Sequence, residues 1–212
     1  MKGVKFDDYH SYLDFGLILS SYSIGDAKPK TEMIDIPGSD GSLDLSEYFG
    51  DVKYKNRKLS FTFSTIGKPS EFLQNYSRVQ NLVNGRKMKI VLDDDPEFYY
   101  VGRVTVDEWK SKPRVGSITI DCDCEPYKYK TYETVVVNKI SGSGTVIYEN
   151  LRKWVAPVFA VTAPVTITFE GTSVVLDAGE YTVPAIEFKQ GQNIVTYTGD
   201  TVVTVKYQDG GL

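Results

Sequence analysis

Hydrophobic and polar residues alternate with a period of two along most of this chain, and that pattern predicts β-strands. In the first part, the alternation predicts strands at 87–92, 99–109 and 116–130, with a loop rich in proline, glycine and charge at 110–116. From residue 133 onward, short alternating segments are separated by turn signals about ten residues apart, which is typical of a β-sandwich. The chain is therefore predicted to be mostly β.

One segment has a helical period instead. Between Pro69 and Gly85, apolar residues recur at three- and four-residue spacing, namely at Phe72, Leu73, Tyr76, Val79, Leu82 and Val83. Ser70 is a suitable N-cap residue, and Gly85 suits the position that follows a helix C-terminus. We expect one amphipathic helix of about 14 residues, packed through its apolar stripe on a sheet.

The stretch from residue 51 to residue 63 changes the parity of its apolar positions. Val52 and Tyr54 are even, whereas Leu59, Phe61 and Phe63 are odd. If all five side chains face the core, a β-bulge is needed across residues 56–58. The alternative is one strand whose two halves bury opposite faces.

Composition narrows the classes of function. The net charge is −4, and acidic and basic residues are well mixed, which argues against sequence-specific binding of a nucleic acid. No apolar stretch is long enough for a transmembrane helix, and the first residues lack the apolar core of a signal peptide. Of the 24 basic and 28 acidic residues, 39 lie in residues 1–132 and 13 in residues 133–212, and this change of composition predicts two domains with these bounds.

Few residues suggest chemistry. A lone histidine, His10, cannot build a multi-histidine metal site, and we expect it at a surface or an interface. Cys122 and Cys124 share the parity of Ile118 and Ile120, so we expect both thiols in the core of a protein from a reducing compartment.

The remaining polar clusters also have structural explanations. The run Asp93–Asp95 precedes a proline and is expected to be a solvated hairpin turn, because it lacks the spacing of a calcium loop. The chain shows no phosphate-binding loop and no nucleophile motif, so we expect no enzyme, no cofactor and no metal. Trp109 and Trp154 could stack on sugar rings, although a tryptophan beside alternating strands is more often part of a core.

The segment "IPGSDGSLDLSEYFGDVKYKNRKLSFTF", residues 36–63, resembles the N-terminal signature of the distal tail proteins of bacteriophages with long, non-contractile tails. The matching positions are Pro37, Gly38, Asp40, Gly41, Leu43, Asp44, Phe49, Gly50, Val52, Tyr54, Asn56, Arg57, Leu59, Phe61 and Phe63. The helix, the segments "YYVGRVTV" and "IDCDCEPYKYK", and the glycine-rich terminus are similar to the family in order and spacing, so the resemblance covers nearly the whole chain.

The resemblance implies an N-terminal domain like a β-sandwich, with one helix and a long hairpin, followed by a C-terminal galectin-like β-sandwich. It implies a structural protein that forms a hexameric ring at the tail tip of the virion, after assembly in the cytoplasm of the bacterial host. The ring would join the tail-tube protein to the baseplate and receptor-binding proteins.

The residues add one hypothesis to that picture and leave alternatives open. A ring of identical chains uses a heterologous interface, and the mixed charges of Asp51, Lys53, Lys55 and Arg57 could set its register. We therefore expect the 36–63 hairpin at the subunit interface. One alternative is a carbohydrate-binding protein that recognises cell-wall glycans through its C-terminal sandwich, with Trp154 as the stacking residue. A hydrolase of wall polymers would need a carboxylate pair or a metal.

Overall fold

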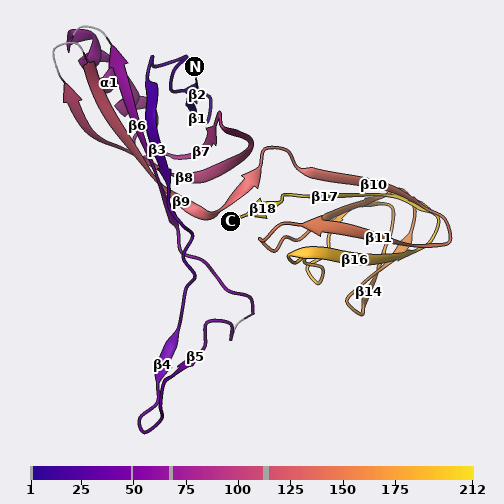
Figure 1. Cartoon of the computed structure of the whole chain (residues 1–212). Helices are drawn as coiled ribbons and strands as arrows, with labels where there is room; N and C mark the ends of the chain where they lie inside the picture. Colours follow the sequence, from indigo (N-terminus) through magenta and orange to yellow (C-terminus); the bar gives the residue numbers. More distant parts are fainter. Residues whose placement is uncertain (1, 49, 67–68, 112–114) are drawn as a thin grey trace. The chain divides into compact units, whose positions relative to one another are not determined.

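The computed structural model describes residues 2–48, 50–66, 69–111 and 115–212. The fold is mostly β, as the sequence predicts, and the described residues contain one α-helix (Figure 1). The contacts divide the chain into two compact units, Met1–Pro126 and Tyr127–Leu212. The predicted domains, 1–132 and 133–212, stay a prediction.

The first unit is built on one large curled sheet in the strand order β2-β1-β7-β8-β9-β6-β3. Two of these strands, β8 and β9, have 17 and 16 residues, and they contain the segments 99–109 and 116–130 that the alternation predicts as strands. The strands are β1 (Val4–Phe6), β2 (Tyr9–His10), β3 (Ile18–Ile24), β6 (Arg57–Ile66), β7 (Lys87–Leu92), β8 (Asp95–Ser111) and β9 (Val115–Lys130).

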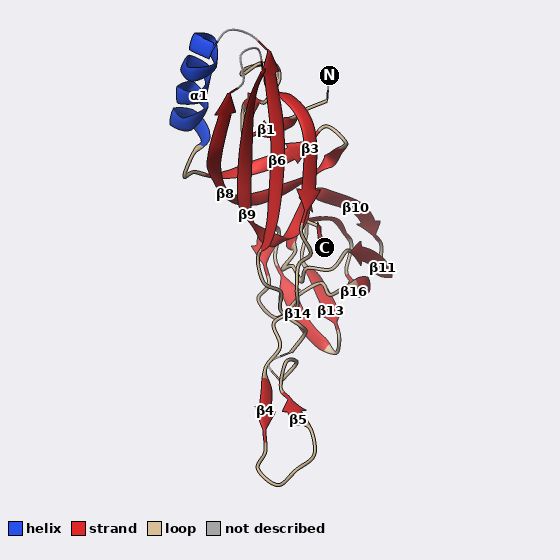
Figure 2. Cartoon of the chain, turned by 60° about the vertical axis from the view of Figure 1, so that its left-hand side comes forward, coloured by secondary structure: helices blue, strands red, loops and turns tan. Residues whose placement is uncertain are grey.

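The core of this unit includes the side chains that odd positions of β6 and even positions of β9 direct to the same face of the sheet. Leu59, Phe61 and Phe63 on β6 are fully buried and lie opposite Cys122, Ile120 and Ile118 on β9. The helix α1 (Pro69–Val83) lies along one side of the sheet in Figure 2. Its buried residues are Phe72, Val79 and Val83, with Tyr76 and Leu82 partly buried.

Two details of the predicted helix are wrong. The helix begins at Pro69, so Ser70 is inside its first turn and is not the N-cap; proline is favoured at this first helical position. Leu73 belongs to the spacing pattern but is 60% exposed, because the apolar stripe is narrower than the pattern suggests. Gly85 has φ +74°, which agrees with its predicted place after the helix.

Neither alternative for residues 51–63 is found, because there is no β-bulge at residues 56–58 and the stretch is not one strand with two oppositely buried halves. Strand β6 begins at Arg57 and pairs with β9 without a register shift from Arg57 to Ile66. Val52 and Tyr54 precede this strand and belong to a separate, projecting segment. The change of parity therefore marks the point where the chain returns from this segment to the sheet.

That projecting segment, residues 25–56, is called the arm below (Figures 1 and 2). Its two halves run side by side, with hydrogen bonds from Lys30 N to Lys53 O (2.7 Å) and from Lys55 N to Lys28 O (2.8 Å). It ends in a two-stranded sheet of β4 (Met33–Asp35) and β5 (Ser42–Asp44). The motif glycines Gly38 and Gly41 have φ values of +84° and +74° in the connecting turn, a conformation that glycine adopts without steric cost.

The second unit contains two four-stranded sheets, in the orders β10-β17-β12-β15 and β11-β16-β13-β14. Their inward-facing residues form one core around Phe188, so the predicted C-terminal β-sandwich is confirmed. The strands are β10 (Thr134–Ile140), β11 (Ser143–Asn150), β12 (Val158–Val161), β13 (Val165–Phe169), β14 (Thr172–Leu176), β15 (Gly179–Thr182), β16 (Gly191–Thr198) and β17 (Thr201–Tyr207).

The last residues fasten the end of the chain within this unit. Strand β18 (Gly210–Gly211) pairs with the last part of β9, where Gly210 lies opposite Tyr129. The buried carboxylate of Asp209 accepts hydrogen bonds from Lys130 Nζ (2.5 Å) and Thr134 Oγ1 (2.7 Å). No helix in the described ranges is long and apolar enough to cross a membrane.

Candidate functional site

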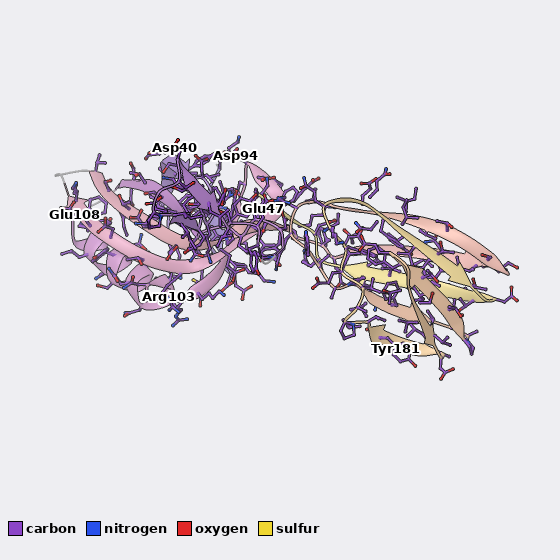
Figure 3. All side chains as sticks on the ribbon, turned by 90° about the horizontal axis from the view of Figure 1, so that it is seen from below. Asp40, Glu47, Asp94, Arg103, Glu108 and Tyr181 are labelled. Carbon is purple, nitrogen blue, oxygen red and sulfur yellow. The ribbon has the colours of Figure 1, made fainter. Side chains whose placement is uncertain are left out.

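The arm exposes an unusual amount of apolar surface. Ile34 and Leu43 lie opposite each other on β4 and β5, and they are 44% and 48% exposed. Met33, Ile36 and Tyr48, also on the arm, are more than 45% exposed, and Tyr48 reaches 73%. The acidic residues Asp40 and Glu47, labelled in Figure 3, are exposed on the same segment.

A segment of this kind is poorly suited to stand alone in water. A two-stranded hairpin without further strands or a helix against it is only marginally stable. Neighbouring apolar side chains on such a hairpin mark a surface that another protein covers. The arm is therefore the candidate functional site, and the function that it indicates is binding of a protein.

The arm also contains a hollow of about 540 Å³. Its apolar lining comes from Ile34, Leu45 and Tyr48. Its charged lining comes from Lys30, Glu32, Asp51 and Lys53. An apolar floor with charges of both signs around it can hold an apolar side chain and fix the direction of its approach.

The structure separates the four residues that were predicted for the subunit interface. Asp51, Lys53 and Lys55 lie on the arm, and the first two line its hollow. Arg57 lies at the start of β6 and is only 7% exposed, with its guanidinium carbon 5.8 Å from the centre of the Tyr100 ring. The burial of Arg57 could have been predicted, because it shares the parity of Leu59 and the inward-facing phenylalanines.

The apolar residues of the arm are not identified from the sequence. Leu43 is a matching position of the motif, Ile34 and Ile36 are not, and all three are exposed. The signal that could have identified them is a pair of short apolar segments around a glycine-rich turn, with too few residues to bury one another. The motif position Phe49 lies outside the described residues.

His10 and the acidic turn stabilise the N-terminal segment. His10 Nε2 lies 3.1 Å from Asp93 Oδ2, while Nδ1 faces the backbone N–H groups of Tyr12 and Leu13 at 3.1 and 3.2 Å. Both ring nitrogens are thus used in local contacts. Asp94 receives a hydrogen bond from the Lys2 ammonium, which lowers the pKa of this carboxyl below its ordinary value.

These contacts explain why acidic side chains are present in this turn. Asp93 also accepts a hydrogen bond from Gly3 N at 2.7 Å. Among the described residues, no group of three or more histidine, cysteine, aspartate or glutamate side chains could hold a metal ion. The turn therefore connects the first strand to the β7–β8 hairpin.

The two cysteines are free thiols in the core, as predicted. Burial raises the pKa of Cys124 to about 12, and burial also raises the pKa of Cys122. Both side chains therefore stay protonated near neutral pH. Buried thiols of this kind are poor nucleophiles and poor metal ligands.

Neither tryptophan ring is free of neighbouring side chains. The Trp109 ring packs against Phe72 and Tyr76, with ring centres 5.8 and 5.5 Å apart, between α1 and the sheet. Trp154 is partly buried, and Lys189 Nζ lies 5.6 Å from the centre of its ring. That ammonium is held by Glu170 at 2.7 Å, so it occupies one face of the indole. Sugar stacking by Trp154 stays a prediction.

Comparison with known proteins identifies the fold. No protein-family model matches the sequence, and no curated protein matches it. The structure is similar to the crystal structure of the Dit protein (gp 19.1) of SPP1, with a TM-score of 0.68, 13% sequence identity and all of both chains covered. That protein is described as a paradigm of the hub of the adsorption apparatus in phages that infect Gram-positive bacteria. The chain therefore has the fold of this distal tail protein, and the predicted resemblance of fold is confirmed.

Proposed function

We propose that this chain is a structural hub protein of a phage tail tip and a member of the distal tail protein family. It would form a hexameric ring that joins the tail tube to the baseplate and receptor-binding proteins, after assembly in the host cytoplasm. The observation that carries the proposal is the likeness to SPP1 Dit over the full length of both chains. The apolar arm adds independent support, because a hub binds proteins and needs no catalytic centre.

A ring imposes a condition on the surfaces of each subunit. Identical chains in a ring meet through two different surfaces, so that each subunit offers one to each neighbour. The arm provides one such surface. The edges of the large sheet provide others, because β2 and β3 are its end strands and Tyr22 and Ile24 on β3 are exposed. The arm of one subunit would lie on its neighbour.

Charges on the arm would set the register of this contact. Asp51 and Lys53 line the hollow, and Lys55 is exposed two residues farther along the arm. Like charges in juxtaposition are unfavourable, so mixed charges reject wrong alignments of two surfaces. Arg57 would act indirectly, through the packing of β6.

The test is a charge reversal on the arm. The double variant Lys53→Glu/Lys55→Glu should shift the protein from the ring toward smaller species in sedimentation velocity, with the thermal midpoint almost unchanged. Arg57 is left in place, since a carboxylate at this buried position would test folding. The control is Lys139→Glu on β10, an exposed reversal in the second unit, which should leave the ring intact. Equal ring populations for all three proteins would refute a role of the arm charges.

Carbohydrate binding by the C-terminal sandwich is the alternative function. Its sequence signal is Trp154, which has one face occupied by Lys189. Binding to a host-wall glycan array that disappears in Trp154→Ala would favour this alternative. Binding that survives the substitution, or no binding at all, would leave the structural role as the function of this unit.

A further inference from the structure

Both outer faces of the C-terminal sandwich mix polar and apolar side chains. On the β11–β16–β13–β14 sheet, the hydroxyl side chains of Thr145, Thr166, Thr168, Thr196 and Thr198 lie beside the exposed Ile147, Ile194 and Val175. On the β10–β17–β12–β15 sheet, Val135, Val137, Val158, Ala160 and Val202 face outward together with Lys139, Thr204 and Lys206. On this second face, the exposed valines gather at one edge of the sheet.

The second face reaches the edge of its sheet at β10. Val137 lies opposite Thr204 and Val135 lies opposite Lys206, so the exposed valines of this edge strand have polar neighbours on β17. Val135 and Val137 are 53% and 61% exposed. The most exposed apolar side chains of the face are thus on its outermost strand.

Strand β10 has few of the usual features that protect an edge, and Lys139 near its end is its one charged side chain. It pairs with β17 over seven consecutive residues without a register shift, and it contains no proline and no inward-facing charge. Within the described ranges, no strand pairs with its other side. Protected edges are usually short, bulged or charged, because a long, regular edge recruits another strand. Of the other edge strands of the sandwich, β11 has eight residues, whereas β14 and β15 have only five and four.

A charge at one end of β10 indicates what the recruited strand must contain. Lys139 faces the same side as Val135 and Val137 and lines a hollow of about 270 Å³ with Asp200. Asp200 Oδ1 instead accepts hydrogen bonds from Ser141 Oγ at 3.2 Å and Gly142 N at 2.9 Å. In the described part of the chain, no carboxylate forms an ion pair with Lys139, although Lys206 on the same face is paired with Glu180 at 3.3 Å. The free ammonium complements an acidic side chain.

We propose that the outer edge of β10 binds an extended strand of a partner protein, which adds to the sheet as a fifth strand. Two apolar side chains of that strand lie opposite Val135 and Val137, and an acidic side chain lies opposite Lys139. Backbone hydrogen bonds provide the affinity, and the alternate side chains provide the specificity. A second copy of β10 is a poorer occupant, since antiparallel pairing centred on Val137 puts Lys139 opposite Val135 and leaves both lysines without a carboxylate.

The probe is a fluorescein-labelled peptide, Thr-Glu-Thr-Val-Thr-Val-Thr, which matches this order in antiparallel pairing. It is titrated with the full chain, and binding is followed by fluorescence anisotropy. Hydrogen–deuterium exchange at millimolar peptide then locates the site. We expect slower exchange confined to the segment 134–140. Replacing the peptide's glutamate by lysine should weaken binding at least about twofold, from the strength of a cross-strand charge pair.

Variants of the protein distinguish binding at β10 from nonspecific binding of the peptide. Val137→Lys should weaken binding at least about fivefold, whereas Val175→Lys, at a 70% exposed valine on the edge strand β14, should not change it. Lys139→Glu should weaken the glutamate peptide and strengthen the lysine peptide. Equal binding by all variants, protection outside β10, or a β10 edge already protected in the free protein would overturn the proposal. The proposal concerns the second unit alone, so it can fail while the ring forms, and the ring can fail while the peptide binds.

Discussion

The double variant Ile34→Lys/Leu43→Lys gives the sharpest test of the arm. These residues face each other across β4 and β5 and are 44% and 48% exposed, so about half of each side chain remains to be covered by a neighbour. Complete burial of such a side chain is worth about 1.5–3 kcal/mol. Covering the remaining half contributes about 1 kcal/mol per residue, or about 2 kcal/mol per interface. Loss of that contribution weakens each interface roughly 30-fold.

The assay is sedimentation velocity over a hundredfold range of protein concentration, with a urea melt on the same samples. We expect the variant to dissociate at concentrations where the unmodified protein is a ring. Its unfolding free energy should change by no more than about 0.5 kcal/mol, because both positions are on the surface of the free subunit. The matched control is Ile147→Lys/Ile194→Lys, a cross-strand pair in the second unit that is 53% and 55% exposed. Equal assembly of the two variants would refute the reasoning.

Three further predictions concern the cores of the two units. Tyr148 and Tyr197 share a buried hydrogen bond of 2.7 Å, so each phenylalanine variant should lose about 1–3 kcal/mol in urea melts, and the double variant should lose less than the sum of the two. Burial raises the pKa of Cys124 to about 12 and also raises that of Cys122, so the protonated thiols favour the folded state. The contribution of the two thiols to the unfolding free energy should be complete below about pH 9 and should fall from there toward pH 12. In urea melts between pH 8 and pH 10.5, the double alanine variant should show a flatter decline. Asp209→Ala removes the carboxylate that lies 2.5 Å from Lys130 Nζ and should lower the unfolding free energy in urea melts by about 2 kcal/mol. An unchanged urea midpoint would show that Asp209 does not hold the C-terminal strand in place.

Much of the fold could be predicted because local periodicity and burial agree. The segment 87–92 alternates regularly and is a strand with the predicted bounds. Phe72, Val79 and Val83 recur on one face of α1 and are buried there. Cys122 and Cys124 follow the parity of their buried neighbours.

The remaining features depend on contacts that no local pattern contains. Val52 and Tyr54 alternate with charged residues although they lie outside the large sheet, because residues on a narrow hairpin alternate as they do in a strand. Leu73 fits the helical spacing but is 60% exposed, because spacing alone does not show how wide a face of α1 is buried. Arg57 is a different case, because its charge suggests an interface while its parity, shared with Leu59, already indicates the buried position that it has on β6.

The sequence motif and the arm overlap only in part, and the role of this segment as a subunit interface stays a prediction. The motif covers residues 36–63, and the arm shares residues 36–56 with it. Its charges at Asp51, Lys53 and Lys55 are visible in the sequence. Its apolar surface is not, since exposure of Ile34 and Leu43 is known only once the absence of a third strand beside β4 and β5, within the described residues, is established.

We propose that identical copies of this chain close into a ring of six. This proposal is tested by the solution mass of the unmodified protein, measured by light scattering on a size-exclusion column over a range of loading concentrations. We expect a species of six times 23.8 kDa that dissociates when the apolar residues of the arm are replaced by lysine. A mass of 23.8 kDa at every concentration, or a larger species that is unchanged by loss of the arm residues, would contradict it.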